Sequence, residues 1–230
     1  MCGRYTLIID GERIAQATGW TIRSQVYPRY NIAPTQLVLV ARRPWDGGDI
    51  ELVEMRWGLI PWWAKDPSIA SRMINARSET VLEKPAFREP LAQRRCLILA
   101  NGFYEWQSTG AKSKQPWYFA APDERLLTFA GLWDRWVSPD SEPVETCTIV
   151  TTSGNEVLQG IHERMPVIIE DGDRETWLDV RTVSAQDACS LLRPAPADLL
   201  HAITVSTEVN RSASEGPQLI LALDARESAR

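Results

Sequence analysis

Short segments that are apolar, or that alternate apolar with polar residues, recur along the chain. They are rich in β-branched and aromatic residues, a pattern typical of β-strands. The pattern predicts strands at Gln36–Arg42, Glu51–Leu59, Cys96–Trp106, Pro116–Ala121, Leu126–Trp136, Thr146–Thr152, Pro166–Glu170 and Ala202–Ser206.

Helical spacing is confined to a few short segments. It predicts helices at Gly11–Thr18, Glu79–Gln93, Asn155–His162, Arg174–Asp179 and Ala185–Leu192. Pro85 and Pro90 interrupt the second of these helices, and we expect Asp173 and Ser184 to cap the last two. Helices of this length are expected to flank a sheet.

The order of these segments favours an α+β fold. Strands often follow one another directly, as between Cys96 and Trp136, instead of alternating with helices. We expect a mainly antiparallel curved sheet or open barrel with short flanking helices. Because no linker, charge block or repeat divides the chain, we expect one domain over residues 1–230. Its final segment, from Glu208, should dock through Leu219–Leu223 and then fray.

Composition narrows the class of protein. A hydrophobic content of 44% with 24% charged residues is ordinary for a soluble globular protein, and no apolar run approaches the roughly 18 residues of a membrane span. The first residues lack the features of a secretory signal, so we expect a cytoplasmic protein, or a nuclear one in a eukaryote. Four scattered cysteines and two histidines predict neither a disulfide framework nor a metal site.

Charge is distributed unevenly over a chain whose net charge is −5. Residues 1–100 hold 14 Lys and Arg against 10 Asp and Glu, a net charge of +4, whereas the remainder holds 11 against 20, a net charge of −9. Nucleic-acid binding requires local positive charge. Any anion-binding face should therefore draw on the N-terminal part.

Cys2 becomes the first residue if Met1 is removed, because aminopeptidases accept a small second residue. Its α-amino group, with a reference pKa of about 7.7–8.0, and its thiol, with a pKa of about 8.5, then form a 1,2-aminothiol. Such a group condenses with an aldehyde to a Schiff base and closes a thiazolidine ring through sulfur, which an internal cysteine cannot do. The alternative is that Cys2 stands beside the start codon by chance.

Two segments near Cys2 in the sequence contain groups suited to DNA. Arg4 can contact an anion next to the terminus. The strand-like stretch Met55–Trp63 breaks at Pro61 and presents Trp62 and Trp63 in a loop, where aromatic rings can stack on bases. Core or lid positions for both tryptophans are the alternative in a chain with 10 Trp residues.

The segment Ile74–Thr80 has the alternation expected of a strand-to-helix junction that lines a site. Asn75 can hydrogen-bond a reacting centre and Arg77 can pair with phosphate. A helix cap and a surface ion pair are the structural alternatives.

Glu105 and His162 are candidate acid–base groups. Glu105 lies between Tyr104 and Trp106, an apolar setting that raises the pKa of a carboxyl group. Strict alternation would instead place Glu105 on a solvent-facing side of its strand. His162, followed by Arg164, is its candidate partner, although a lone histidine is more often structural.

Six blocks in order resemble the SOS-response-associated peptidase (SRAP) family, whose members crosslink to abasic sites, and the likeness covers nearly the whole chain. The blocks are Met1-Cys2-Gly3-Arg4-Tyr5, Tyr30-Asn31-Ile32-Ala33-Pro34, Trp57-Gly58-Leu59-Ile60-Pro61-Trp62-Trp63, Ile74-Asn75-Ala76-Arg77, Gly102-Phe103-Tyr104-Glu105-Trp106 and His162-Glu163-Arg164-Met165-Pro166. The chain departs from the family pattern at Leu99, where Pro is typical. It also has few basic residues over Glu79–Ala86, which weakens the prediction of groove contacts there.

The resemblance implies a role for each candidate. Cys2 would be the nucleophile, Asn75 would orient its amine or the sugar aldehyde, and Glu105 would be the acid–base group. His162 would assist ring opening, strand cleavage or reversal. The remaining implied roles are phosphate binding for Arg4, Arg77 and Arg164, shaping of the DNA groove for Trp62 and Trp63, and scaffolding for Asn31 and Thr151.

We therefore predict a covalent thiazolidine crosslink between Cys2 and abasic sites in single-stranded DNA, formed by a monomer without cofactor, metal or membrane. One alternative is an N-terminal-nucleophile thiol peptidase that removes its own leader, which would need an oxyanion hole. The other is a non-catalytic binder of single-stranded or modified DNA. Only the binder would keep its function in Cys2→Ala.

Overall fold

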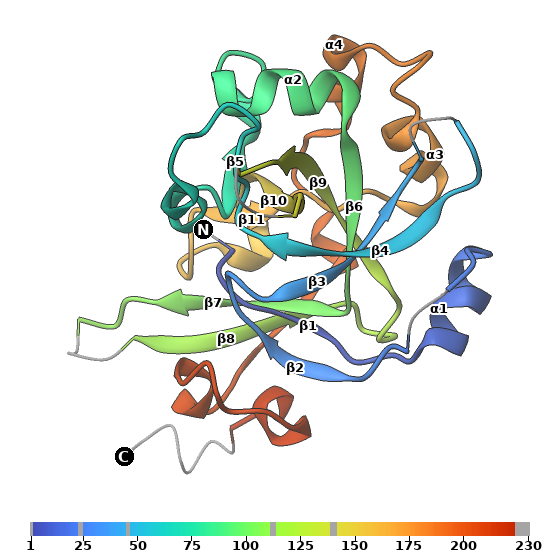
Figure 1. Ribbon diagram of the computed structural model, residues 1–230. Helices are drawn as coiled ribbons and strands as arrows, with labels where there is room; N and C mark the ends of the chain where they lie inside the picture. The colour runs from blue at the N-terminus through green and yellow to red at the C-terminus, as the bar shows by residue number, and fades with distance from the viewer. Residues whose placement is uncertain (1, 23–24, 45–46, 111–113, 139–141, 224–230) are drawn as a thin grey trace.

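Five strands close into a barrel, and a second sheet of five strands packs on it (Figure 1). The computed structural model describes residues 2–22, 25–44, 47–110, 114–138 and 142–223. The α+β fold predicted from the sequence is confirmed, with a closed barrel in place of an open one.

The strands and α-helices are short. The strands are β1 (Tyr5–Leu7), β2 (Arg29–Ile32), β3 (Leu37–Arg42), β4 (Glu51–Trp57), β5 (Asn75–Arg77), β6 (Arg95–Ala100), β7 (Gly102–Gln107), β8 (Gln115–Ala120), β9 (Leu127–Trp136), β10 (Val144–Ser153), β11 (Arg164–Pro166) and β12 (His201–Thr204). The α-helices are α1 (Gly11–Thr18), α2 (Pro85–Gln93), α3 (Arg174–Leu178) and α4 (Ala185–Ala188).

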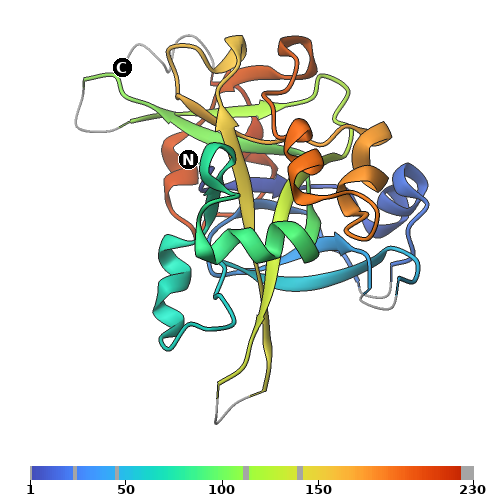
Figure 2. The same ribbon diagram turned by 90° about the horizontal axis from the view of Figure 1, so that it is seen from above.

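The barrel closes because β10 pairs on both sides. It runs antiparallel to β9 and parallel to β4, and β4, β3, β6 and β9 pair antiparallel in that order. Two further strands extend from β10, with β5 parallel and β11 antiparallel to it. Figure 2 shows the β9–β10 hairpin extending beyond the rest of the molecule.

The second sheet has the order β12-β8-β7-β1-β2, so the first strand of the chain lies between β7 and β2. Tyr5 pairs with Phe103 on one side and with Ile32 on the other. The barrel and the sheet share one hydrophobic core, in which the Tyr5 ring makes edge contacts with Trp57 and Phe129. Cys2, three residues before Tyr5, lies buried in the same core.

The predicted strand Cys96–Trp106 is two strands, β6 in the barrel and β7 in the sheet. The residues of β6 are all buried, as expected of a strand covered on both faces. The chain leaves the barrel at Asn101, whose side-chain oxygen accepts the Ile8 N–H at 2.8 Å. A side chain on Gly102 would meet Phe119 O at 2.5 Å, so the crossing requires glycine.

Other differences from the predicted elements have local causes. Helix α2 starts at Pro85, because proline suits the first turn of a helix, so the predicted Glu79–Gln93 helix is shortened. The predicted helix Asn155–His162 is a single 3-10 turn, Glu156–Leu158, which is followed by Gly160 in the left-handed region at φ +77°. Ser184 caps α4 as predicted, whereas Asp173 makes no side-chain capping bond.

The remaining differences concern strand bounds and the C-terminal segment. The predicted strand Pro166–Glu170 is shifted to β11, and β1, β2 and β5 were not predicted because three or four residues carry little pattern. Leu219 docks against Tyr104 and Tyr118, whereas Leu221 is exposed. Residues 224–230, predicted to fray, lie outside the described residues. Within the described residues, no helix is long and apolar enough to span a membrane.

Candidate active site

Cys2 is completely buried at the meeting point of β1, β5 and β7. Its carbonyl oxygen accepts a hydrogen bond from Asn75 Nδ2 at 2.9 Å. Two residues later, the Arg4 carbonyl accepts the Tyr104 N–H at 3.0 Å. The start of the chain is thus bonded to both β5 and β7. Met1, whose removal was predicted, lies outside the described residues.

The Cys2 thiol is held in its neutral form. Burial, with a smaller contribution from the negative charge of Glu105, raises the pKa of the Cys2 thiol far above its usual value. Its sulfur lies 3.9 Å from the Arg4 carbonyl oxygen, a weak hydrogen-bond contact. Cys2 therefore is not a preformed thiolate.

Glu105 is buried, with 2% of the residue exposed. The solvent-facing alternative is therefore wrong, because β7 lies inside the sheet and the face opposite Tyr104 turns toward Cys2 and His162. Burial raises the pKa of Glu105 to about 7, and the charge of Lys114 opposes part of that effect. A carboxyl group with this pKa exchanges protons readily near neutral pH.

His162 is the second candidate acid–base group, and it lies close to Glu105. Its Nε2 lies 3.6 Å from Glu105 Oε2. Burial lowers the pKa of His162 below its usual value, so the ring is neutral at pH 7. Its Nδ1 lies 3.0 Å from the Arg164 backbone nitrogen and 3.1 Å from the Arg164 carbonyl oxygen, contacts that hold the ring with Nε2 toward Glu105.

Asn75 completes the site from β5. This strand pairs with β10, where Asn75 lies opposite Ile149. Its side-chain NH2 is bonded to the Cys2 carbonyl, and its buried oxygen Oδ1 accepts no hydrogen bond from the described residues. An unsatisfied acceptor beside the start of the chain is suited to receive an N–H group.

The predicted phosphate ligands Arg164 and Arg77 differ in what surrounds them. Arg164 Nη2 donates to Glu79 Oε2 at 3.0 Å and to the Thr151 carbonyl at 2.6 Å, and Nη1 also pairs with Glu79. Arg77 is exposed at the end of β5. Thr151 pairs in register with both Arg77 and Pro166, so it joins β5 to β11 as a scaffold residue would.

Arg4 is engaged inside the protein. Its Nη1 donates to Asn31 Oδ1 at 2.6 Å and to the Val209 carbonyl at 2.7 Å. Asn31 Nδ2 donates in turn to the carbonyls of Ser214 and Arg211. These bonds tie the start of β1 to the C-terminal segment and engage both donors of Nη1.

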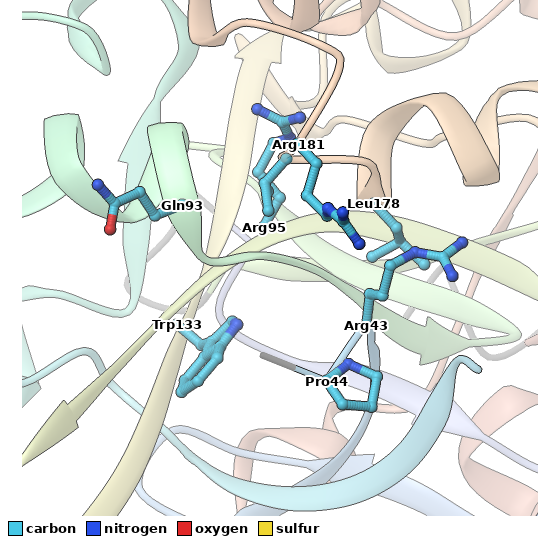
Figure 3. A pocket seen from close by; sticks show the side chains of 8 residues that line it. Arg43, Pro44, Gln93, Arg95, Trp133, Leu178 and Arg181 are labelled. Carbon is cyan, nitrogen blue, oxygen red and sulfur yellow. The ribbon is translucent and has the colours of Figure 1, made fainter. Parts of the chain in front are cut away.

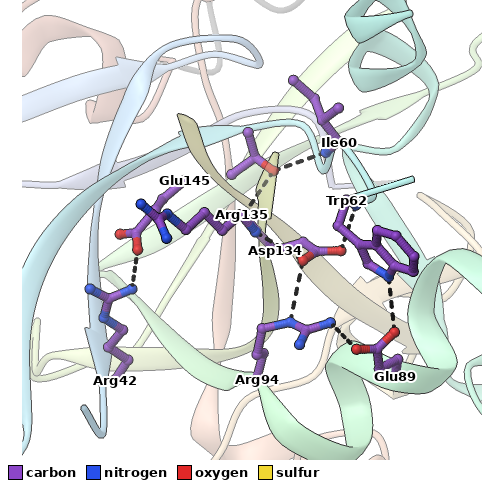
Figure 4. Close-up of polar contacts among 9 residues, drawn as sticks. Arg42, Ile60, Trp62, Glu89, Arg94, Asp134, Arg135 and Glu145 are labelled. Atoms are coloured by element: carbon purple, nitrogen blue, oxygen red, sulfur yellow. Dashed lines mark hydrogen bonds and ion pairs between the residues drawn. The ribbon is translucent and has the colours of Figure 1, made fainter. Parts of the chain in front are cut away.

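Trp62 and Trp63 are exposed by 58% and 47%, respectively, so the core alternative is wrong for both. Trp62 is nevertheless fixed, because its backbone N–H donates to Asp134 and its indole Nε1 donates to Glu89, each at 3.0 Å. Arg94 joins the two carboxylates, lying 3.3 Å from Asp134 and 3.1 Å from Glu89 (Figure 4).

Sequence reasoning missed this network. Asp134 is buried in β9. It directly follows the mostly apolar and aromatic stretch Leu126–Trp133, which contains no other acidic residue. A carboxylate at such a position needs partners, which is the signal that could have found it. Its partners come from α2 and from the Trp62 loop, which no local pattern connects.

The assembled site combines a buried nucleophile, an amide and an acid–base pair. Cys2, Asn75, Glu105 and His162 come from four separate parts of the chain and meet at the β1–β5–β7 junction. No group of three or more His, Cys, Asp or Glu within the described ranges is placed to hold a metal ion. Such a constellation can transfer protons and form a covalent bond to an electrophile.

Comparison with known proteins gives consistent matches over most of the chain. The model of the family described as SOS response associated peptidase (SRAP) matches residues 1–212. The abasic site processing protein YoqW of Bacillus subtilis is 42% identical over 223 residues, covering 96% of this chain and 99% of that protein. The abasic site processing protein HMCES of Gallus gallus is 35% identical, covering 97% and 78%, respectively.

Solved structures share the fold. A protein from Bacteroides thetaiotaomicron superposes with a TM-score of 0.87 at 27% identity, covering 96% of this chain and all of that one. A protein from Bordetella bronchiseptica has a TM-score of 0.74 at 30% identity, covering 89% of this chain and all of that one.

Proposed function

Because this chain belongs to the SOS response associated peptidase (SRAP) family, we propose that it processes abasic sites in DNA, forming a covalent thiazolidine link between Cys2 and the lesion. The observation that carries the proposal is the burial of Glu105 beside Cys2 and His162, which gives the carboxyl group a pKa of about 7. The names of the relatives supply the substrate class.

The reaction starts after Met1 has been removed. The neutral Cys2 amine attacks the aldehyde carbon of the opened deoxyribose, forming a C–N bond and a carbinolamine. Glu105 donates a proton to the carbinolamine hydroxyl, which leaves as water, and the Glu105 carboxylate then takes the nitrogen proton to give the neutral imine. The Cys2 thiol then adds across the C=N bond: sulfur bonds to carbon, and the thiol proton passes to nitrogen.

The order of the two nucleophiles follows from their environment. A thiol whose pKa is raised by burial carries little thiolate, so the amine reacts first and sulfur closes the ring intramolecularly. The same neutral thiol is unsuited to attack on a peptide bond. The peptidase alternative would need a cation beside Cys2 to stabilise a thiolate.

Asn75 and His162 act as positioning groups in this proposal. The unpartnered Asn75 oxygen accepts an N–H of the freed Cys2 amine and directs its lone pair to the aldehyde. His162 lies beside Glu105 and assists the opening of the sugar ring. Both roles depend on groups already fixed before substrate arrives.

Single-stranded DNA is the proposed partner. Exposed Trp62 and Trp63 offer stacking surfaces, and exposed Arg77 offers a phosphate contact. Arg164 can join them by exchanging Glu79 for a phosphate. Arg4, whose donors are bonded internally, supports the site through Asn31 in preference to binding phosphate.

The direct test incubates the purified protein with an abasic single-stranded oligonucleotide. We expect a denaturation-resistant adduct on the N-terminal peptide, with the mass of the oligonucleotide less one water, found by mass spectrometry. Cys2→Ser retains the amine and should give an adduct that borohydride must reduce to survive denaturation, whereas Cys2→Ala tests the need for a side-chain nucleophile. An equally stable adduct from Cys2→Ala refutes the thiazolidine.

A further inference from the structure

A hollow of about 220 Å³ lies outside the candidate active site and shares no lining residue with it (Figure 3). The end of β3, the junction of α2 with β6, strand β9 and the segment after α3 surround it. Its polar lining comprises Arg43, Arg95, Arg181 and Gln93, and its apolar lining includes Trp133 and Leu178.

The lining has three guanidinium groups and no carboxylate. Arg95 is buried, and its donors go to main-chain carbonyls, which include Trp177 O at 2.6 Å and Leu91 O at 2.9 Å. Carbonyl oxygens satisfy hydrogen bonds but do not cancel a full positive charge, and the nearby Asp179 carboxylate, which also interacts with Arg43, offsets one of the three charges. The hollow therefore has a fixed cation behind its wall.

Arg43 and Arg181 supply the donors that an anion would contact. Arg181 is exposed, and its guanidinium makes no hydrogen bond or ion pair within the described residues. Arg43 pairs with Glu175, whose side chain is 68% exposed. Because ion pairs this exposed contribute little, a bound anion can displace Glu175.

The size and the apolar wall narrow the class of ligand. The volume is below the roughly 300–1,000 Å³ of pockets for drug-sized ligands, so the hollow fits no more than a single small phosphate ester with its ring. Trp133 offers that ring an aromatic neighbour. Trp133 and Pro44 also line a neighbouring hollow of about 610 Å³ whose lining includes Trp62.

We propose that this hollow, called the arginine pocket below, binds a nucleotide. The phosphate lies between Arg43 and Arg181, and the base lies beside Trp133. The nucleotide is either free or part of a DNA strand that continues from Trp62. The choice of a nucleotide among organic phosphates rests on the proposed function. The positive charge and the size of the pocket are observations that do not depend on that function.

The test measures binding of deoxyadenosine 5′-monophosphate, deoxyadenosine and an undamaged single-stranded oligonucleotide by calorimetry. The variants are Arg181→Gln and Arg43→Gln, which leave the carbonyl bonds of Arg95 intact. Arg13→Gln is the matched control, because Arg13 is an exposed arginine of α1 far from the pocket lining.

We expect the monophosphate to bind more tightly than the nucleoside. Each pocket variant should weaken that binding about tenfold, whereas Arg13→Gln changes it less than about twofold. An equal loss for the oligonucleotide identifies the strand as the source, and a loss confined to the monophosphate identifies a free nucleotide. If wild type binds neither ligand, or if both pocket variants bind both ligands like wild type, the proposal is wrong.

Failure here is separable from failure of the crosslinking proposal, because the ligands contain no aldehyde. Crosslinking of a short abasic oligonucleotide by Arg181→Gln, measured at saturating DNA, should proceed at the wild-type rate. A protein that binds nucleotide but never crosslinks would refute only the proposed chemistry at Cys2.

Discussion

His162 Nε2 lies 3.6 Å from Glu105 Oε2, and the two groups have opposite displacements of their pKa values. Burial raises the pKa of the Glu105 carboxyl group to about 7 and lowers that of the His162 imidazole, so at pH 7 the imidazole is mostly neutral and the carboxyl group is about half protonated. A protonated Glu105 carboxyl group beside a neutral imidazole keeps a proton at the site without a buried imidazolium. This relationship fixes the expected pH dependence.

The rate of crosslinking should have a bell-shaped pH profile. It rises as the Cys2 amine loses its proton, with a reference pKa of about 7.7–8.0, and it falls as Glu105 ionises above about 7. The maximum therefore lies between these values. In Glu105→Gln the alkaline limb should disappear and the rate should fall about a hundredfold. Single-turnover kinetics across pH measures both, and an unchanged alkaline limb in the variant would assign that limb to another group.

Glu79→Gln should strengthen binding to undamaged single-stranded DNA. The Glu79 carboxylate pairs with Arg164 through two oxygens and competes with phosphate for it. Removing the charge frees Arg164, and the slope of log affinity against log salt should steepen by about one phosphate contact. Glu83→Gln is the control, because Glu83 is exposed nearby and makes no such pair. Equal gains in both variants would indicate a general charge effect.

Asp134→Ala should destabilise the protein and also remove the hydrogen bond that fixes the Trp62 backbone. Asp134 is buried, and its loss leaves the Arg94 guanidinium with Glu89 alone, which costs about 3 kcal/mol in the free energy of unfolding. Urea denaturation measures that loss, with Asp123→Ala as an exposed control that leaves stability unchanged. Asp134→Asn, which retains an acceptor for the Trp62 N–H, should recover part of both stability and DNA affinity. No recovery would mean that the charge alone matters.

Gly102→Ala should destabilise the crossing between the barrel and the sheet. Its Cβ would lie 2.5 Å from Phe119 O and from Tyr118, so β7 and β8 must separate, at a cost of about 1–3 kcal/mol. Gly172→Ala is the matched control, since a Cβ there meets no atom within 4 Å and no positive φ is required. Equal unfolding midpoints for the two variants would contradict the crossing argument.

Much of the fold follows from local patterns, and the exceptions are instructive. Long runs such as β9 and the α1 segment with its Asp10 cap were predictable because their periodicity extends over several residues. The division of β6 from β7 was not, because it depends on Asn101 bonding to Ile8, nearly a hundred residues away. Barrel closure depends equally on the long-range pairing of β10 with β4.

The residues of the candidate site could be predicted from the sequence, but their burial and hydrogen bonding could not. The motifs identify Cys2, Asn75, Glu105 and His162, and the structure brings them together. The burial of Glu105 contradicted simple alternation, because both faces of β7 are covered. The internal bonding of Arg4 and the network around Trp62 involve partners that sequence order does not reveal.

The central place of β1 in its sheet determines when Cys2 becomes enclosed during biosynthesis. Cys2 leaves the ribosome first, but the strand that encloses it, β7, is translated about a hundred residues later. At about 5–20 residues per second the aminothiol remains accessible for several seconds. The proposed removal of Met1 is therefore expected within this interval, because the pairing of Tyr5 with Phe103 afterwards encloses Cys2.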